Sequence, residues 1–277
     1  DCGPNADMRL ISFAGSRRGR DGILPYVGND IVDLLEPGNR GKSRDARFLK
    51  RVFTADECLK VLLSREGDLA LWTLWAAKET AFKVMQKHDP HVSSRPRHYP
   101  VLLFPPPPNA SEKRDGLPLS GVVTTPRGSV HVRLLRTSRY VHCIGTDAPW
   151  PAMDAIQWRV NERPAGSDES RQVREEAKRH MARHFREAPE AICIRQAAGT
   201  GAPLVYLGDR RTSIDLSMSH DGRFTAHAFW GKNPFAADEG RAPGRMPETS
   251  TRHDFAGCRA ELASGDRVRT SGFQSLP

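Results

Sequence analysis

The hydrophobic pattern between residues 25 and 149 predicts a strand, three helices and a hairpin. The apolar run YVGNDIVDL at 26–34 is typical of a short strand. Helical patterns follow at 44–53, 54–64 and 71–85, and Thr54 with Glu57 has the spacing of a capping box at the start of the second. A Pro-rich loop at 95–116 then leads to two strands with alternating apolar residues, SVHVRLLRT and YVHCIGTD.

A second segment repeats this build between residues 150 and 231. DAIQWRVNE is another strand, and 167–185 is an amphipathic helix that we expect to start at Ser167. The apolar positions of this helix keep a spacing of four residues, at Val173, Ala177, Met181 and Phe185. A hairpin at 192–208 and two strands around a His-Asp-Gly turn at 213–230 complete the segment.

The two segments share small details that indicate an old duplication. GLP in the first corresponds to GAP in the second, and TSRYVHCIG corresponds to MSHDGRFTAHAF. We therefore predict an α+β fold with two similar lobes, 25–149 and 150–231, each with helices packed on a small antiparallel sheet. Residues 1–24 and 232–277 are rich in Gly, Pro, Ser, Arg and Asp with little periodicity, so we expect flexible segments there.

The charge of the chain is concentrated in the lobes. The formal net charge is +9, the two terminal segments carry +1 each, and residues 25–231 carry the remaining +7. A basic body suits an acidic partner such as nucleic acid, a polyphosphate ligand or an acidic protein, although charge alone fits a merely basic protein equally well. Five widely spaced cysteines without a CxxC pair, no signal-like start and no membrane-length apolar run lead us to expect a cytoplasmic protein.

The helix at 71–85 carries charged residues on a buried pattern. Trp75, Glu79 and Lys83 lie at i, i+4 and i+8 and so form one stripe at the edge of the apolar face. A carboxylate there needs a partner, because an unpaired buried charge is costly. Either Lys83 provides that partner as an i,i+4 ion pair, or Glu79 shares a metal ion with a second carboxylate.

Asp30 is the candidate for that second carboxylate. It interrupts an apolar strand, where polar residues often mark a site. Two carboxylates completed by water and substrate phosphate are a usual Mg²⁺ site. Asp33 is a weaker candidate, since an offset of three residues places it on the other face of a regular strand.

The SMSHDG motif offers Ser219 and His220 as further candidates. A Ser-His-Asp triad fails, because adjacent strand residues point to opposite faces and no G-x-S-x-G elbow is present. A contact of these two side chains with a phosphate or a base is one interpretation, and a plain hairpin turn is the other. GTGAP is neither a Walker loop nor a dinucleotide fingerprint.

Together, these motifs resemble the 4'-phosphopantetheinyl transferases. GNDIVD, RFLKRVFTADE and WAAKETAFK look like the G-x-D-I strand, F-T/S-x-x-E helix start and W-x-x-K-E-[AS]-x-x-K helix of that family. GAP and LSMSHDG are similar to its G-K-P and S-H-S elements, so the resemblance spans about residues 26–231. It implies transfer of phosphopantetheine from coenzyme A to a serine of an apo acyl, polyketide or peptidyl carrier protein, with release of 3',5'-ADP.

The resemblance also implies roles for individual residues. Asp30 and Glu79 would bind Mg²⁺ or Mn²⁺, Glu79 would position or deprotonate the serine, and Lys83 would stabilise the leaving phosphate. The residues implied in coenzyme A binding are Lys78, Gly201, Pro203, Ser219 and His220, the last two at the 3'-phosphate end.

The sequence departs from the family pattern at two positions. Val32 stands where surfactin-type members have a third acidic ligand, and Ala202 replaces the lysine of G-K-P, for which Arg195, Arg210 or Arg211 is a possible substitute. The motif order follows the short holo-[acyl-carrier-protein] synthase type in a chain long enough for two lobes. We therefore expect a monomeric pseudo-dimer with its site between the lobes.

Two other functions stay open. One is a pseudoenzyme of the same fold that binds coenzyme A or carrier proteins without transfer. The other is a basic nucleic-acid-binding protein, which the absence of a basic helix, an RNP motif and a zinc motif makes the weaker hypothesis.

Overall fold

The computed structural model describes residues 25–104 and 118–232. The terminal segments for which we expect flexibility therefore lie outside the described residues, apart from Lys232. No helix in the described ranges combines the length and apolar character that a membrane crossing requires.

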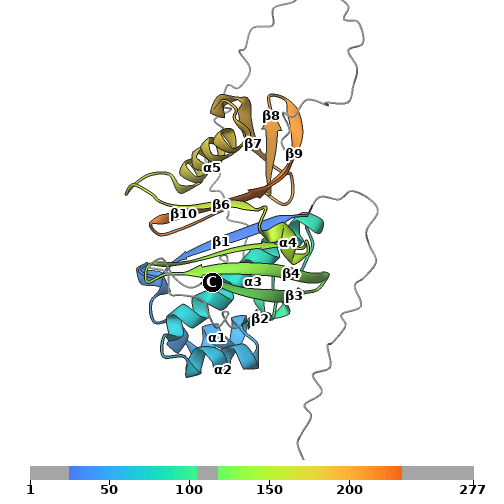
Figure 1. Cartoon of the computed structure of the whole chain (residues 1–277). Coiled ribbons are helices and arrows are strands. Elements are labelled where there is room, and N and C mark those ends of the chain that lie inside the picture. Colours follow the sequence, from blue (N-terminus) through green and yellow to red (C-terminus); the bar gives the residue numbers. More distant parts are fainter. Residues whose placement is uncertain (1–24, 105–117, 233–277) are drawn as a thin grey trace, which may run out of the picture.

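The first lobe contains a five-stranded antiparallel sheet and three α-helices (Figure 1). Its strand order is β1-β5-β4-β3-β2, and the strands are β1 (Val27–Asp33), β2 (Val101–Phe104), β3 (Pro118–Thr125), β4 (Gly128–Arg136) and β5 (Tyr140–Thr146). The helices are α1 (Ala46–Val52), α2 (Ala55–Leu63) and α3 (Gly67–His88). The expected capping box at Thr54 and Glu57 is present and starts α2.

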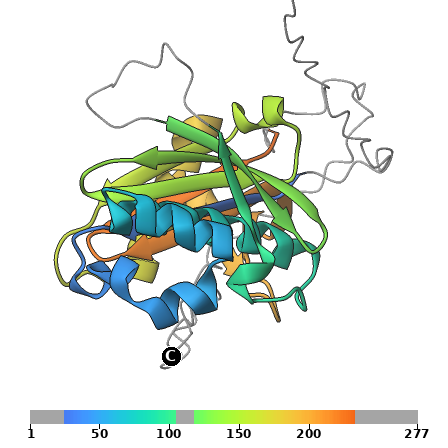
Figure 2. The ribbon, with the colours of Figure 1, turned by 90° about the horizontal axis from the view of Figure 1, so that it is seen from below.

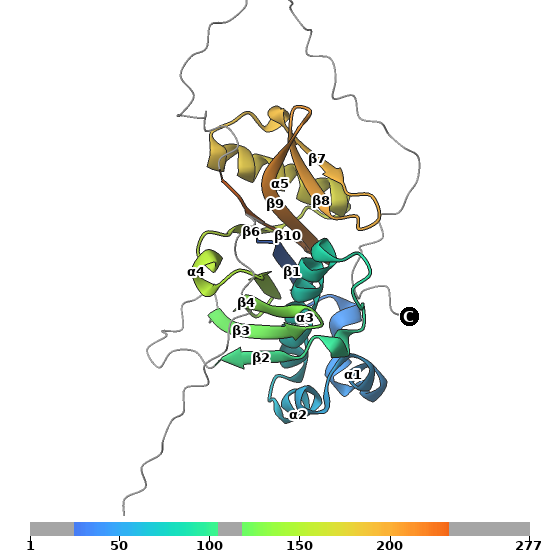
Figure 3. The ribbon, with the colours of Figure 1, turned by 90° about the vertical axis from the view of Figure 1, so that its right-hand side faces the viewer.

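The second lobe repeats this topology. A short helix, α4 (Trp150–Met153), leads into a sheet of order β6-β10-β9-β8-β7. Its strands are β6 (Gln157–Glu162), β7 (Ile192–Gln196), β8 (Pro203–Leu207), β9 (Arg210–Asp221) and β10 (Phe224–Trp230), and α5 (Glu169–Phe185) packs on them. Each strand of one lobe has a counterpart at the same place in the other sheet, and Figure 3 shows the two lobes one above the other. The predicted α+β fold with two sheets is confirmed.

The structure corrects three local predictions. The Pro-rich stretch contains β2, and β3 follows it, so the first lobe has two strands more than the sequence pattern predicted. Asp168, not Ser167, caps α5 by accepting a hydrogen bond from the Arg171 amide. The helix expected at 71–85 is longer and starts at Gly67.

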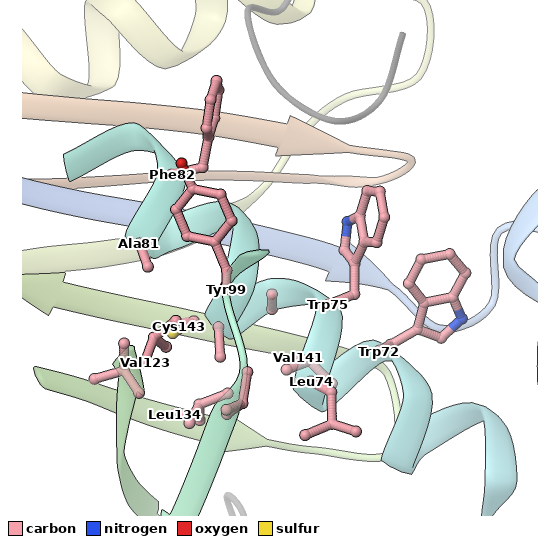
Figure 4. Close-up of a cluster of buried hydrophobic side chains, with 14 of the residues drawn as sticks. Trp72, Leu74, Trp75, Ala81, Phe82, Tyr99, Val123, Leu134, Val141 and Cys143 are labelled. Carbon is pink, nitrogen blue, oxygen red and sulfur yellow. The ribbon is translucent and has the colours of Figure 1, made fainter. Parts of the chain in front are cut away.

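Helix α3 is the centre of the first lobe. It lies across one face of the sheet, and α1 and α2 cover its other side (Figure 2). The tryptophans Trp72 and Trp75 pack edge to face and join the apolar cluster that reaches the strands (Figure 4). Because α3 is enclosed on most sides, every charged side chain on it must find a partner or line a cavity.

A pair of glycines lets α3 approach the sheet closely. Gly28 of β1 and Gly145 of β5 are direct neighbours in the strand register. A Cβ on Gly28 would lie 2.2 Å from the carbonyl oxygen of Thr80, and one on Gly145 would lie 2.8 Å from the Thr80 methyl group. Only glycine permits this approach, which sets the height of α3 above β1.

The lobes meet where β1, the edge strand of the first sheet, runs beside β9. Side chains of β9 accept hydrogen bonds from amides of β1, each 188 residues earlier in the chain. The bonds run from Val27 to Asp215, from Asn29 to Ser217 and from Asp33 to Asp221, at 2.6 to 2.9 Å. The edge of β1 is therefore satisfied by side chains of the other lobe instead of by another strand.

Asp33 fixes the end of this contact. Its carboxylate accepts two hydrogen bonds from the Arg223 guanidinium, at 2.7 and 2.8 Å, and one from the Arg223 amide. Burial opposes the charge on Asp33, but the bonds from Arg223 outweigh it and lower the pKa of Asp33. Asp33, which the sequence analysis gave as the weaker candidate for a metal ligand, thus links the two lobes.

Candidate active site

A cavity lies between the lobes. Residues of β1 and α3 form its first wall, and residues of α5, β9 and the β7–β8 connection form the second. It contains Asp30, Glu79 and Lys83 together with Gly201, Pro203, Ser219 and His220. Seven of the eight predicted site residues therefore line this one cavity. The three from the first lobe and the four from the second lobe are far apart in the sequence.

The first wall carries a cluster of two carboxylates and the ammonium group of Lys83. The Lys83 Nζ lies 3.0 Å from Oδ1 of Asp30 and 3.9 Å from Oε1 of Glu79, and it also donates to the carbonyl oxygen of Asn29. The side chains of Asp30 and Glu79 are 1% and 2% exposed, whereas that of Lys83 is 19% exposed at the cavity. The i,i+4 pair of Glu79 with Lys83 is therefore present, and Asp30, the proposed second carboxylate, contacts the same ammonium group.

The electrostatics of this cluster favour additional positive charge. Burial raises the pKa of Asp30 to about 7 and Glu79 adds to the rise, while Lys83 opposes it. Burial opposes the charge on Lys83, but Asp30 and Glu79 outweigh it and raise the pKa of Lys83. The second oxygen of Asp30, Oδ2, is buried without a hydrogen-bond partner. Two carboxylates thus share one ammonium group, and one oxygen has spare capacity to accept a cation.

These carboxylates are the residues that could hold a metal ion. Within residues 25–104 and 118–232, no group of three or more His, Cys, Asp or Glu side chains gathers at one point. A site with two protein oxygens fits Mg²⁺ or Mn²⁺, which keep several waters, and does not fit a structural zinc centre.

The serines of β9 hold the lobes together beside the cavity. Ser217 accepts the amide of Asn29, and Ser219 donates to the side-chain oxygen of Asn29 at 2.8 Å. His220 instead contacts Glu169, with Nδ1 2.8 Å from the carboxylate. Burial lowers the pKa of His220, against the opposing effect of Glu169. The hydroxyl of Ser219 bonds to Asn29, which agrees with the sequence argument against a triad.

Lys78 lies outside this cavity. Its ammonium group is fully buried, 2.8 Å from Glu57, and donates to the carbonyl oxygens of Pro96 and Tyr99. It joins α3 to α2 and to the turn that precedes β2. The structure does not support the expected contact of Lys78 with coenzyme A, because no part of its side chain reaches the cavity.

Arg195, Arg210 and Arg211, suggested as substitutes for the missing lysine, lie away from the cavity as well. Arg195 pairs with Asp209 and stacks on the ring of Tyr206, and none of the three lines the site. Ala202 does line it.

Sequence reasoning missed two cations at this site, Lys87 and Arg174. Lys87 donates to Asp215 and to the carbonyl oxygens of Val27 and Leu216, so it bridges the lobes. Arg174 belongs to α5 and reaches the cavity from the second lobe. Arg174 directly follows the apolar Val173 and so lies at the edge of the buried face of α5. This position is the feature of the sequence from which its place at the site could have been predicted.

Comparison with family models matches residues 26–96 to the model described as ACPS: 4'-phosphopantetheinyl transferase superfamily. The matched segment runs from β1 to the turn after α3 and includes Asp30, Glu79 and Lys83. The resemblance found in the sequence is confirmed for this segment. Searches of curated proteins and of solved structures each gave no match.

Proposed function

From the match of residues 26–96 to the 4'-phosphopantetheinyl transferase superfamily, we propose that the chain transfers 4'-phosphopantetheine from coenzyme A to a serine of an apo carrier protein. The observation that supports this most is the shared cavity. It combines Asp30, Glu79 and Lys83 of one lobe with Ser219 and His220 of the other. The motif order supports the holo-[acyl-carrier-protein] synthase type, fused into a monomeric pseudo-dimer.

Asp30 and Glu79 are the proposed Mg²⁺ ligands. The unpartnered Oδ2 of Asp30 and the excess of negative charge in the cluster fit a divalent cation. When bound, the ion would neutralise charge on the pyrophosphate of coenzyme A and hold it in place. Val32 is consistent with a two-carboxylate site whose remaining positions are filled by water and substrate.

The protein side chains then account for the transfer step. The serine oxygen of the carrier forms a bond to the β-phosphorus, and the bond from that phosphorus to the 3',5'-ADP oxygen breaks. Glu79 accepts or orients the proton of the serine hydroxyl. The ammonium group of Lys83, partly exposed to the cavity, stabilises the charge that develops on the leaving phosphate.

The proposed partner is an acidic apo acyl, polyketide or peptidyl carrier protein. Arg47, Lys50 and Arg51 on α1 are exposed and offer a complementary surface. Carrier affinity should therefore fall as salt rises to physiological levels, because exposed charges are screened over about 10 Å at 0.1 M. A flat salt response would indicate a mainly apolar docking surface.

Intact-mass spectrometry tests the proposal. Apo acyl, polyketide and peptidyl carriers are incubated separately with the full chain, Mg²⁺ and coenzyme A, and one of them should gain the mass of phosphopantetheine. Glu79→Gln should reduce turnover by orders of magnitude while coenzyme A still binds, and Glu190→Gln, an exposed control, should behave like the parent. Binding of coenzyme A without a mass gain on any carrier would instead favour the pseudoenzyme.

A further inference from the structure

Helix α2 presents three leucines to solvent. Leu59, Leu62 and Leu63 are 55%, 62% and 83% exposed, and their spacing of i, i+3 and i+4 places them on one face of the helix, which we call the leucine face. The opposite face packs on the lobe through the buried side chains of Glu57 and Val61. Large apolar side chains that gather on one exposed face mark a contact surface, whereas single exposed ones need no explanation.

A groove between α1 and α2 continues the leucine face. Leu62 lines this groove too, and the buried side chains of Leu49 and Phe53 on α1 form the apolar part of its floor. The two helices lie at the end of the first lobe that is remote from the second lobe (Figures 1 and 3). The groove shares no lining residue with the cavity between the lobes, so it is a separate surface.

The edges of the groove carry positive charge. Arg44, Lys50 and Arg97 line it and are exposed, and none of them forms an ion pair within residues 25–104 and 118–232. No acidic side chain of those ranges lines the groove. Cations without partners beside an apolar floor suit a ligand that carries both carboxylates and apolar side chains.

A second copy of the chain does not fit this surface. Two copies that met here would bring the cations of both grooves together, and like charges across an interface oppose association. Helix α2 has nine residues and is about 14 Å long, too short for the roughly 800 Å² per partner that a stable interface buries. The occupant therefore has to be acidic, and it has to fill the groove as well as cover the leucine face.

We propose that the leucine face and the groove bind an acidic amphipathic helix of a partner protein. The apolar side of that helix covers the leucines and the floor, and its carboxylates pair with the cations at the edges. Lys50 lies on the groove side of α1, whereas Arg47 and Arg51 of the carrier surface proposed above lie on another side and do not line the groove. The partner is thus held on the first lobe without covering the cavity, and this inference does not rest on the proposed function.

Fluorescence anisotropy with two labelled synthetic peptides tests the proposal, in the absence of coenzyme A and carrier. The first peptide is an amphipathic helix with leucines along one side and glutamates on the others, and the second has lysines in place of the glutamates. The full chain should bind the acidic peptide at micromolar concentration and should not bind the basic one. Binding should weaken as salt rises, because the pairing groups are exposed.

Two variants separate the apolar contact from the charged one. Leu63 and Arg97 are both exposed, so replacing them should leave the fold intact. Leu63→Ser should weaken binding of the acidic peptide about 10-fold, through the loss of a buried leucine contact. Arg97→Gln should weaken it about 2- to 5-fold at low salt and reduce the salt dependence. Leu35→Ser, a matched control at an exposed leucine outside the groove, should bind like the parent.

Several outcomes would overturn the proposal. A chain that binds neither peptide, or both equally, does not have the site. Peptide binding that Leu63→Ser leaves unchanged would place the peptide elsewhere. A parent that sediments as a dimer and becomes monomeric on Leu63→Ser would assign the leucine face to self-association. Carrier modification should continue with the acidic peptide bound, and competition between peptide and carrier would show that the groove is not a separate surface.

Discussion

Replacing Gly28 by alanine should damage both the stability of the first lobe and the geometry of the cavity. The new Cβ would lie 2.2 Å from the Thr80 carbonyl oxygen and 2.9 Å from a methyl group of Val84. Ordinary contact begins near 3.4 Å, so β1 and α3 would have to separate by about 1.2 Å. The nearest atom is backbone and cannot rotate away.

The magnitude follows from this forced movement. Overpacking of a core typically costs about 1–3 kcal/mol. For a folded body of this size that corresponds to a fall in melting temperature of about 2–12 °C. Asp30 lies two residues after Gly28 and faces Glu79 and Lys83 on α3, so the same displacement would spread the cluster, and a shift of about 1 Å can reduce turnover roughly 100-fold.

The assay compares Gly28→Ala with Gly38→Ala by differential scanning fluorimetry and by carrier modification. A Cβ on Gly38 would meet nothing within 4 Å, so this control should melt with the parent and keep its activity. Equal melting temperatures for the two variants would refute the reasoning, because β1 and α3 would then not be held at the distance that the glycine permits.

Three further outcomes are expected. EDTA should abolish transfer, and Mg²⁺ or Mn²⁺ should restore it, since the cluster offers only oxygen ligands; full activity in EDTA would remove the metal role from Asp30 and Glu79. Burial lowers the pKa of His142 to about 3, below the value in the unfolded chain, so the unfolded state binds more protons and stability is lost as pH falls below about 6.5. His142→Phe should therefore reduce the loss of unfolding free energy between pH 7.5 and pH 5 by about 2 kcal/mol, measured by urea titration, and an unchanged pH dependence would show that His142 titrates normally. Arg223→Ala leaves the buried carboxylate of Asp33 without its guanidinium and should cost about 1.5–3 kcal/mol, whereas Arg133→Ala, which breaks an exposed pair with Asp154, should cost less than about 1 kcal/mol in the same titration.

The parts of the site that lie within one segment could be predicted from the sequence. Asp30 is conspicuous because it is polar in an apolar strand, and Glu79 and Lys83 share a helical stripe. Each of these signals depends only on local periodicity, which a strand or a helix converts directly into a direction in space. The same holds for α1, α2, α3 and α5.

Other features depend on contacts between distant segments. Lys78 is adjacent to Glu79, yet it faces Glu57 on another helix, and nothing in the local pattern distinguishes the two directions. Arg174 gains its place only when α5 of one lobe stands opposite α3 of the other. Strand β2 was missed because prolines flank a run of only four apolar residues, a length at which periodicity gives little information.

The side-chain bonds from β9 to β1 have a consequence for how the lobes can move. Strand β9 lies between β10 and β8 in its own sheet, so its backbone groups are already paired and only its side chains can bond to β1. Asp215, Ser217 and Asp221 are therefore separate acceptors, each of which can release its amide without breaking either sheet, and they lie beside apolar contacts of Ile31 with Phe224 and Ala226. A substitution at one of these acceptors therefore removes a single polar bond between the lobes, while the apolar clusters that span them, Val27 with Ala228 and Ile31 with Phe224, stay in place.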